Sequence, residues 1–263
     1  MLALAVGSEG GRPLLWQTAP AVPSARLGEV HVWRLPREAL ARALDEGGSV
    51  SSAAEKAQSK RIRRPKARTE QLAGWEFLRE VLSRYLAIPP QELVFDFGPR
   101  GKPSLTQDQN HDALRFSLSH SRGTLLVAVA RGREVGVDVE TIRPERPHLA
   151  LAQRFFSALE AEAFSALPVR VRPFAFASAW TRKEAYLKAT GEGISLRALR
   201  ETEVTFAPGE PARLLSTPNG RADAARWALV PLYPGQGTVG ALCTEEPVRS
   251  LALFDGVGGE RTT

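Results

Sequence analysis

Residues 135–140 constrain this chain most, because their pattern fits one kind of secondary structure and suggests one kind of chemistry. The segment reads V-G-V-D-V-E, so valines alternate with Gly136, Asp138 and Glu140. Period-two alternation of β-branched residues is typical of a β-strand with one buried face. It puts both carboxylates on the other face, about 6–7 Å apart along the strand. Such a pair is either exposed to water or neutralised by a cation, and Mg²⁺ prefers oxygen ligands.

A second segment, 178–195, adds a third carboxylate. Residues 179–189 contain good helix formers and no Gly or Pro, and Gly191 supplies a helix end. Trp180, Glu184 and Lys188 recur at i, i+4 and i+8, so they share one face of the predicted helix. Taken alone, Glu184 and Lys188 are better explained as an ordinary i,i+4 ion pair on a surface helix.

Four motifs together resemble the 4′-phosphopantetheinyl transferases. They are G-V-D-V-E at 136–140, W-T-R-K-E-A-Y-L-K at 180–188, G-K-P at 101–103 and F-S-L-S-H-S at 116–121. The last has Ser117 where the family more often has Asn. Phe155-Phe156-Ser157 with Glu160 is similar to a further family block. Ser157 and Glu160 also have the spacing of a capping box, and we interpret Glu160 as a helix cap rather than a catalytic residue.

The resemblance is to the long, Sfp-type members, which implies an α/β (α+β) fold. It implies two similar halves related by pseudo-two-fold symmetry, with the active site in the cleft between them. The expected divisions are a flexible lead-in (1–26), an N-terminal half (27–130), a C-terminal half (131–246) and a tail (247–263). Local patterns predict strands at 29–35, 93–97, 203–206, 227–232 and 238–242, and helices at 37–44 and 69–86. They also predict a buried strand at 124–130 that forms a hairpin with 135–140, with Gly132 at the bend.

The activity implied by the resemblance is transfer of 4′-phosphopantetheine from coenzyme A to a serine of an apo acyl or peptidyl carrier protein, releasing 3′,5′-ADP. It would serve polyketide, nonribosomal-peptide or fatty-acid synthases. The implied metal ligands are Asp138, Glu140 and Glu184, around Mg²⁺ with Mn²⁺ as an alternative. Glu184 would also act as the base, and Lys188 would meet charge on the leaving phosphate. The implied contacts to coenzyme A are Arg61, Arg68, Lys102, Ser119, His120, Lys183 and Lys188.

Composition narrows the remaining alternatives. The 263 residues carry a formal net charge of +6, which favours an anionic partner. The basic run 60–68 lacks interleaved aromatic residues for stacking on bases, so we expect no nucleic-acid partner. One cysteine favours the cytoplasm, and without a long apolar run we expect no membrane contact. The resemblance to the long members implies a monomer. Two other classes stay open here: a metal-dependent nuclease or phosphodiesterase, and a basic nucleic-acid-binding module.

Overall fold

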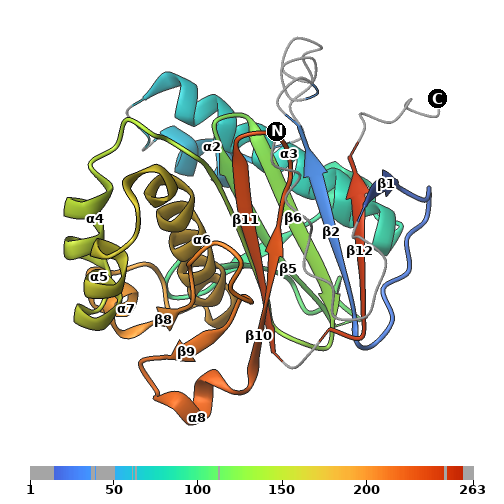
Figure 1. Ribbon diagram of the computed structural model, residues 1–263. Helices are drawn as coiled ribbons and strands as arrows, with labels where there is room; N and C mark the ends of the chain where they lie inside the picture. The colour runs from blue at the N-terminus through green and yellow to red at the C-terminus, as the bar shows by residue number, and fades with distance from the viewer. Residues whose placement is uncertain are drawn as a thin grey trace.

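Two β-sheets lie face to face in the computed structural model, and a long helix covers the outer face of each (Figure 1). The structure describes residues 15–36, 39, 51–60, 62, 64–111, 113–245 and 248–256. The first sheet has the strand order β1-β12-β2-β6-β5, and the second has the order β10-β11-β7. Helix, sheet, sheet and helix therefore stack as successive layers.

The first sheet is built from both ends of the chain. Its strands are β1 (Trp16–Thr18), β12 (Ser250–Asp255), β2 (Glu29–Leu35), β6 (Thr124–Arg131) and β5 (Leu114–Ser121). Strand β6 is apolar on both faces, because Leu125 and Val127 pack towards the helix layer while Leu126 and Ala128 pack towards the second sheet. Helix α3 (Pro65–Leu86) covers the outer face.

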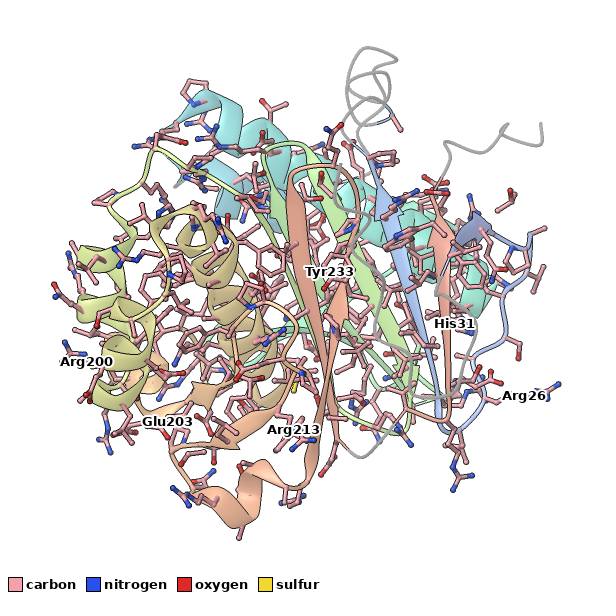
Figure 2. The ribbon with its side chains drawn as sticks, viewed as in Figure 1. Arg26, His31, Arg200, Glu203, Arg213 and Tyr233 are labelled. Atoms are coloured by element: carbon pink, nitrogen blue, oxygen red, sulfur yellow. The ribbon has the colours of Figure 1, made fainter. Side chains whose placement is uncertain are left out.

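The second sheet carries the other helix layer. Its strands are β10 (Trp227–Leu232), β11 (Thr238–Glu245) and β7 (Val135–Thr141). Helix α6 (Arg172–Thr190) packs on it, with α4 (His148–Phe155), α5 (Ala158–Ser165) and α7 (Leu196–Glu201) outside. His31 on β2 and Glu203 at the start of β8 lie on opposite sides of the molecule (Figure 2).

Smaller elements complete the described chain. They are α2 (Ala53–Lys60), β3 (Phe95–Phe97), β4 (Pro103–Leu105), β8 (Glu203–Val204), β9 (Leu214–Ser216), α8 (Arg221–Ala224) and two 3₁₀ turns at Pro90–Glu92 and Val169–Val171. Among all the residues that the structure describes, no helix is both long and apolar enough to cross a membrane.

A shared apolar layer joins the two sheets. Val30 and Val32 of β2 meet Val135, Val137 and Val139 of β7 in one buried cluster. The valine face predicted for 135–140 is therefore buried between the sheets, and the other face of β7 is turned towards α6. This arrangement confirms the predicted α/β class and the strand at 135–140.

Both ends of the chain differ from expectation. Residues 16–18, within the predicted flexible lead-in, form β1, and residues 250–255, within the predicted tail, form β12. Strand β12 pairs in parallel with both β1 and β2, and Figure 1 shows the red β12 beside the blue β2. The first sheet therefore needs residues that no local sequence pattern links to 27–130.

The connection after β6 also differs from expectation. The sequence predicts a hairpin bent at Gly132, and Gly132 does adopt a positive φ of 67°. However, β6 is already hydrogen-bonded on one edge to β2 and on the other to β5. The chain therefore leaves the first sheet, and β7 pairs with β11 in the second. The helix predicted at 37–44 lies almost wholly outside the described residues.

Candidate active site

Gly136 allows helix α6 to lie directly on strand β7. A Cβ atom added there would lie 2.0 Å from the carbonyl oxygen of Ala185 and 2.4 Å from the backbone nitrogen of Ala189. A side chain cannot fit in that space. Because side chains alternate along a strand, Asp138 and Glu140 share this face of β7. Close packing at Gly136 therefore brings α6 against the carboxylates.

Helix α6 presents Glu184 and Lys188 to these carboxylates. The Lys188 ammonium donates to Oδ1 of Asp138 at 2.6 Å and to Oγ of Ser119 at 2.9 Å, and it lies 3.8 Å from Oε2 of Glu184. Asp138 is 3% exposed. The predicted shared face of Glu184 and Lys188 is confirmed, and the residue pair belongs to a partly buried site rather than to an exposed helix face.

These side chains border a cleft of about 400 Å³. The wall from the second sheet and α6 includes Asp138, Glu140, Glu184, Leu187 and Lys188. The opposite wall includes Gln71, Trp75, Arg100, Lys102, Ser119 and His120. One wall is thus rich in carboxylates, while the other offers cations, an imidazole and apolar surface.

The site shifts the pKa values of two of its groups. Burial raises the pKa of Glu184 to about 8, and the charges of Asp138 and Glu140 add to the effect while Lys188 opposes it. Burial also lowers the pKa of His120, and the Lys188 ammonium lowers it further. A negative charge on Glu184 is therefore disfavoured in this site, and a further cation beside the carboxylates would favour it.

The donor set suits a hard cation, although its residues are not gathered around one point. Among the described residues, no three or more His, Cys, Asp or Glu side chains lie close enough together to hold a metal ion. The Lys188 ammonium lies against Asp138 instead. Oδ2 of Asp138 is buried with no hydrogen-bond partner, which is costly unless a ligand meets it. With that oxygen and the neighbouring carboxylates, the residues present fit a divalent cation.

Comparison with known proteins shows the family. The 4′-phosphopantetheinyl transferase superfamily matches residues 134–243. The transferase HetI of Nostoc sp. is 37% identical over 227 residues, which cover 86% of this chain and 92% of HetI. The transferase psf-1 of Bacillus pumilus is 31% identical over 176 residues, covering 67% of this chain and 71% of psf-1.

The chain belongs to the 4′-phosphopantetheinyl transferase superfamily. A putative transferase of Synechocystis sp. adds 36% identity over 170 residues, covering 64% of this chain and 68% of the relative. All four motifs that suggested this transferase family contribute residues to the one cleft, although they span residues 101–188.

Four of the residues expected to contact coenzyme A line this transferase cleft: Lys102, Ser119, His120 and Lys188. The Lys102 ammonium is engaged, because it donates to Glu134 at 2.7 Å and to the carbonyl of Ala189, near the end of α6, at 2.6 Å. Lys102 thus caps α6 and bridges the two walls. Its contact with coenzyme A stays a prediction.

The basic segment before α3 is less informative. Arg61 lies outside the described residues. Arg68 does not line the cleft, and its guanidinium donates to the carbonyl of Ile62 at 3.0 Å. Arg68 precedes the cleft residue Gln71 by about one helical turn on α3. Contacts from Arg61 and Arg68 to a ligand stay predictions.

Lys183 does not reach the cleft, which corrects its place among the expected ligand contacts. Its side chain is fully buried, and its ammonium donates to Oε2 of Glu160 at 2.6 Å and to the carbonyls of Leu199 and Thr202. Burial lowers its pKa, and Glu160 opposes that shift. The capping box of Ser157 and Glu160 is confirmed, so Glu160 and Lys183 form a structural pair away from the reacting groups.

Some cleft residues were not predicted from the sequence. Gln71, Trp75 and Arg100 line it, although only the packing role of Trp75 could be read from a helical pattern. Ser121 ends the F-S-L-S-H-S motif, which predicts no role for it, yet its hydroxyl donates to Oε2 of Glu140 at 3.0 Å. The alternation of Ser117, Ser119 and Ser121 along β5 was the available signal, because it puts all three on one face.

Proposed function

We propose that this protein transfers 4′-phosphopantetheine from coenzyme A to a serine of an apo acyl or peptidyl carrier protein, with Mg²⁺ or Mn²⁺, and releases 3′,5′-ADP. One observation carries the proposal: the carboxylates of β7 and α6 face Lys102 and His120 across a single cleft. That layout suits a cation and a long anionic ligand together. Family membership supports the same reaction class.

The proposed cation ligands are Asp138, Glu140 and Glu184. A bound Mg²⁺ would neutralise pyrophosphate charge and act as a Lewis acid. The free Oδ2 of Asp138 is the atom best placed to gain from it. Glu184, whose pKa is raised to about 8, would lose its proton when positive charge arrives beside it.

In the proposed reaction the carrier serine oxygen forms a bond to the β-phosphorus of coenzyme A, and the bond from that phosphorus to the bridging oxygen breaks. Glu184 would accept the serine proton, because its carboxylate borders the cleft in which the serine must lie. Lys188 moves from Asp138 to the α-phosphate and stabilises charge on the departing 3′,5′-ADP. His120 is neutral at pH 7 and donates a hydrogen bond to a phosphate oxygen.

One chain supplies both walls of the cleft, so we propose that the monomer is active. We also propose that the protein acts in the cytoplasm. The net charge of +6 suits an acidic carrier surface. No contact with nucleic acid or membrane is needed.

The test is the intact mass of apo acyl and peptidyl carrier proteins after incubation with coenzyme A and this protein. With Mg²⁺ the carrier should gain one phosphopantetheine, and 3′,5′-ADP should appear in equal amount. Excess EDTA, or replacement of the acceptor serine of the carrier by alanine, should abolish the gain. No gain on any of several carrier types would contradict the proposal.

A further inference from the structure

Strands β5 and β7 are joined by serine side chains rather than by a backbone ladder. The two strands belong to different sheets. Three serine hydroxyls of β5 accept hydrogen bonds from backbone N–H groups of β7. The pairs are Ser117 with Val137 at 3.1 Å, Ser119 with Val139 at 3.3 Å and Ser121 with Thr141 at 3.2 Å. The serines recur every second residue of β5, and so do the N–H groups that they meet on β7. The same kind of hydrogen bond is therefore made three times.

Two of the three serines make a second bond, to a carboxylate of β7. Ser119 donates to Oδ1 of Asp138 at 2.7 Å, and Ser121 donates to Oε2 of Glu140 at 3.0 Å. A hydroxyl has one proton and can also accept. Each of these two serines therefore accepts a hydrogen bond from a backbone N–H of β7. It also donates one to the carboxylate of the residue just before that N–H. Ser117 has no such partner, because residue 136 is glycine.

The second bonds fix one oxygen of each carboxylate. Oδ1 of Asp138 is held by Ser119 and Lys188, and Oδ2 is left buried without a partner. In the part of the chain that the structure describes, the hydrogen bonds to Glu140 come from Ser121 and Arg143, and both end on Oε2. Each carboxylate is oriented through one oxygen, and the other is left for a ligand.

We infer that Ser121, together with Ser119, is a positioning residue that orients the β7 carboxylates for the divalent cation without touching it. The inference rests on the proposed function, because it presupposes a cation at Asp138 and Glu140. Hydrogen bonds to ligating carboxylates restrict their orientation, and their loss typically weakens metal binding about 10–100-fold. Ser121 gives the sharper test, because Ser119 also contacts Lys188.

The experiment measures Mn²⁺ affinity by electron paramagnetic resonance in the presence of saturating coenzyme A. Ser121→Ala should weaken Mn²⁺ binding about 10-fold or more. Ser117→Ala is the matched control, because it removes the same kind of bond to the β7 backbone but none to a carboxylate. It should keep Mn²⁺ affinity within about twofold, while both variants lower the melting temperature similarly. Ser121→Thr keeps a hydroxyl and should recover most of the affinity.

Two results would overturn the inference. One is wild-type Mn²⁺ affinity in Ser121→Ala, and the other is an equal loss in Ser117→Ala, since the serines would then only hold the strands together. If Ser121→Ala does not fold, Ser121→Cys fills the site with a much weaker donor, and unchanged affinity there would be equally contrary. A wild-type protein that binds coenzyme A but no Mn²⁺ would instead remove the cation from the proposed function, and this inference with it.

Discussion

The Lys188 ammonium and a bound cation would compete for Asp138. In the structure Lys188 donates to Oδ1 of a carboxylate whose side chain is 4% exposed. A buried ion pair that loses one partner leaves an uncompensated charge. Lys188 therefore has a second role besides the one proposed in the reaction, because it neutralises the site before ligands arrive.

Lys188→Met should reveal both roles. In EDTA the variant should lose about 3 kcal/mol of unfolding free energy, because Asp138 stays buried without its cation. Transfer should fall about 100-fold with saturating substrates, the usual size of one lost charge-stabilising contact. Urea unfolding with and without Mn²⁺ plus coenzyme A, and initial transfer rates, measure these effects. Wild-type stability in EDTA would show that the pair contributes little.

Glu184 should give the metal-free protein an unusual pH dependence. Its pKa is raised to about 8 in the fold from an ordinary 4.5, so the native state binds more protons than the unfolded state between these values. Stability should therefore fall as pH rises from about 5 to 8, by up to about 1.4 kcal/mol per pH unit. Glu184→Gln should remove this slope, and the difference between the two proteins in urea titrations with EDTA isolates it. Parallel curves for the two would contradict the assignment.

At the scale of elements, the contact between β7 and α6 depends on the absence of a side chain at Gly136. The Cβ of an alanine at residue 136 would overlap the backbone of α6, which carries Glu184 and Lys188. Neither backbone can relax without moving a carboxylate away from its partner.

Gly136→Ala should cost about 3 kcal/mol or more of unfolding free energy and reduce transfer strongly even where the protein remains folded. Gly235→Ala is the matched control, because its added Cβ would meet only Oγ1 of Thr238, at 3.7 Å. The control should change stability by less than about 0.5 kcal/mol. Equal denaturant midpoints for the two variants would refute the packing argument.

The strand and helix of the site could be predicted because their signals are local. Valine alternation defined the face of β7, and i, i+4 spacing put Glu184 and Lys188 together. The same geometry explains why Lys183 was misplaced. It precedes Glu184 by one residue, about 100° around the helix, so it points to Glu160 instead. Lys183 matches the family motif in sequence, but its angular position around the helix decides which way its side chain points.

At the scale of the molecule, the least predictable feature is the return of the chain to its first sheet. Strand β12 lies between β1 and β2, although more than 200 residues separate it from either. The sequence of a short strand does not indicate which other strand it will pair with. The pairing of β7 with β11 could not be predicted for the same reason. The residues that line the cleft could therefore be predicted better than the sheets that bring them together.

Strand β12 should stabilise both sheets, because Leu253 packs in the apolar cluster that they share and is 4% exposed. Leu253→Ala should lower the free energy of unfolding by about 2–5 kcal/mol. Unfolding should remain a single transition by fluorescence and circular dichroism, since the core is common. Ser250→Ala, at an exposed position of the same strand, is the control and should be nearly neutral. Separate transitions for the two sheets would contradict a shared core.

The central claim is that phosphopantetheine transfer occurs at the carboxylates of this cleft. The most direct measurement is the initial rate of carrier mass gain across a Mg²⁺ titration, for the wild type and for Asp138→Asn. The substitution keeps the shape of a side chain that is 4% exposed but removes its charge. We predict Mg²⁺-dependent transfer by the wild type, and a loss of about 100-fold or more in the variant that extra Mg²⁺ does not fully restore. Equal rates and equal Mg²⁺ dependence would place the chemistry elsewhere.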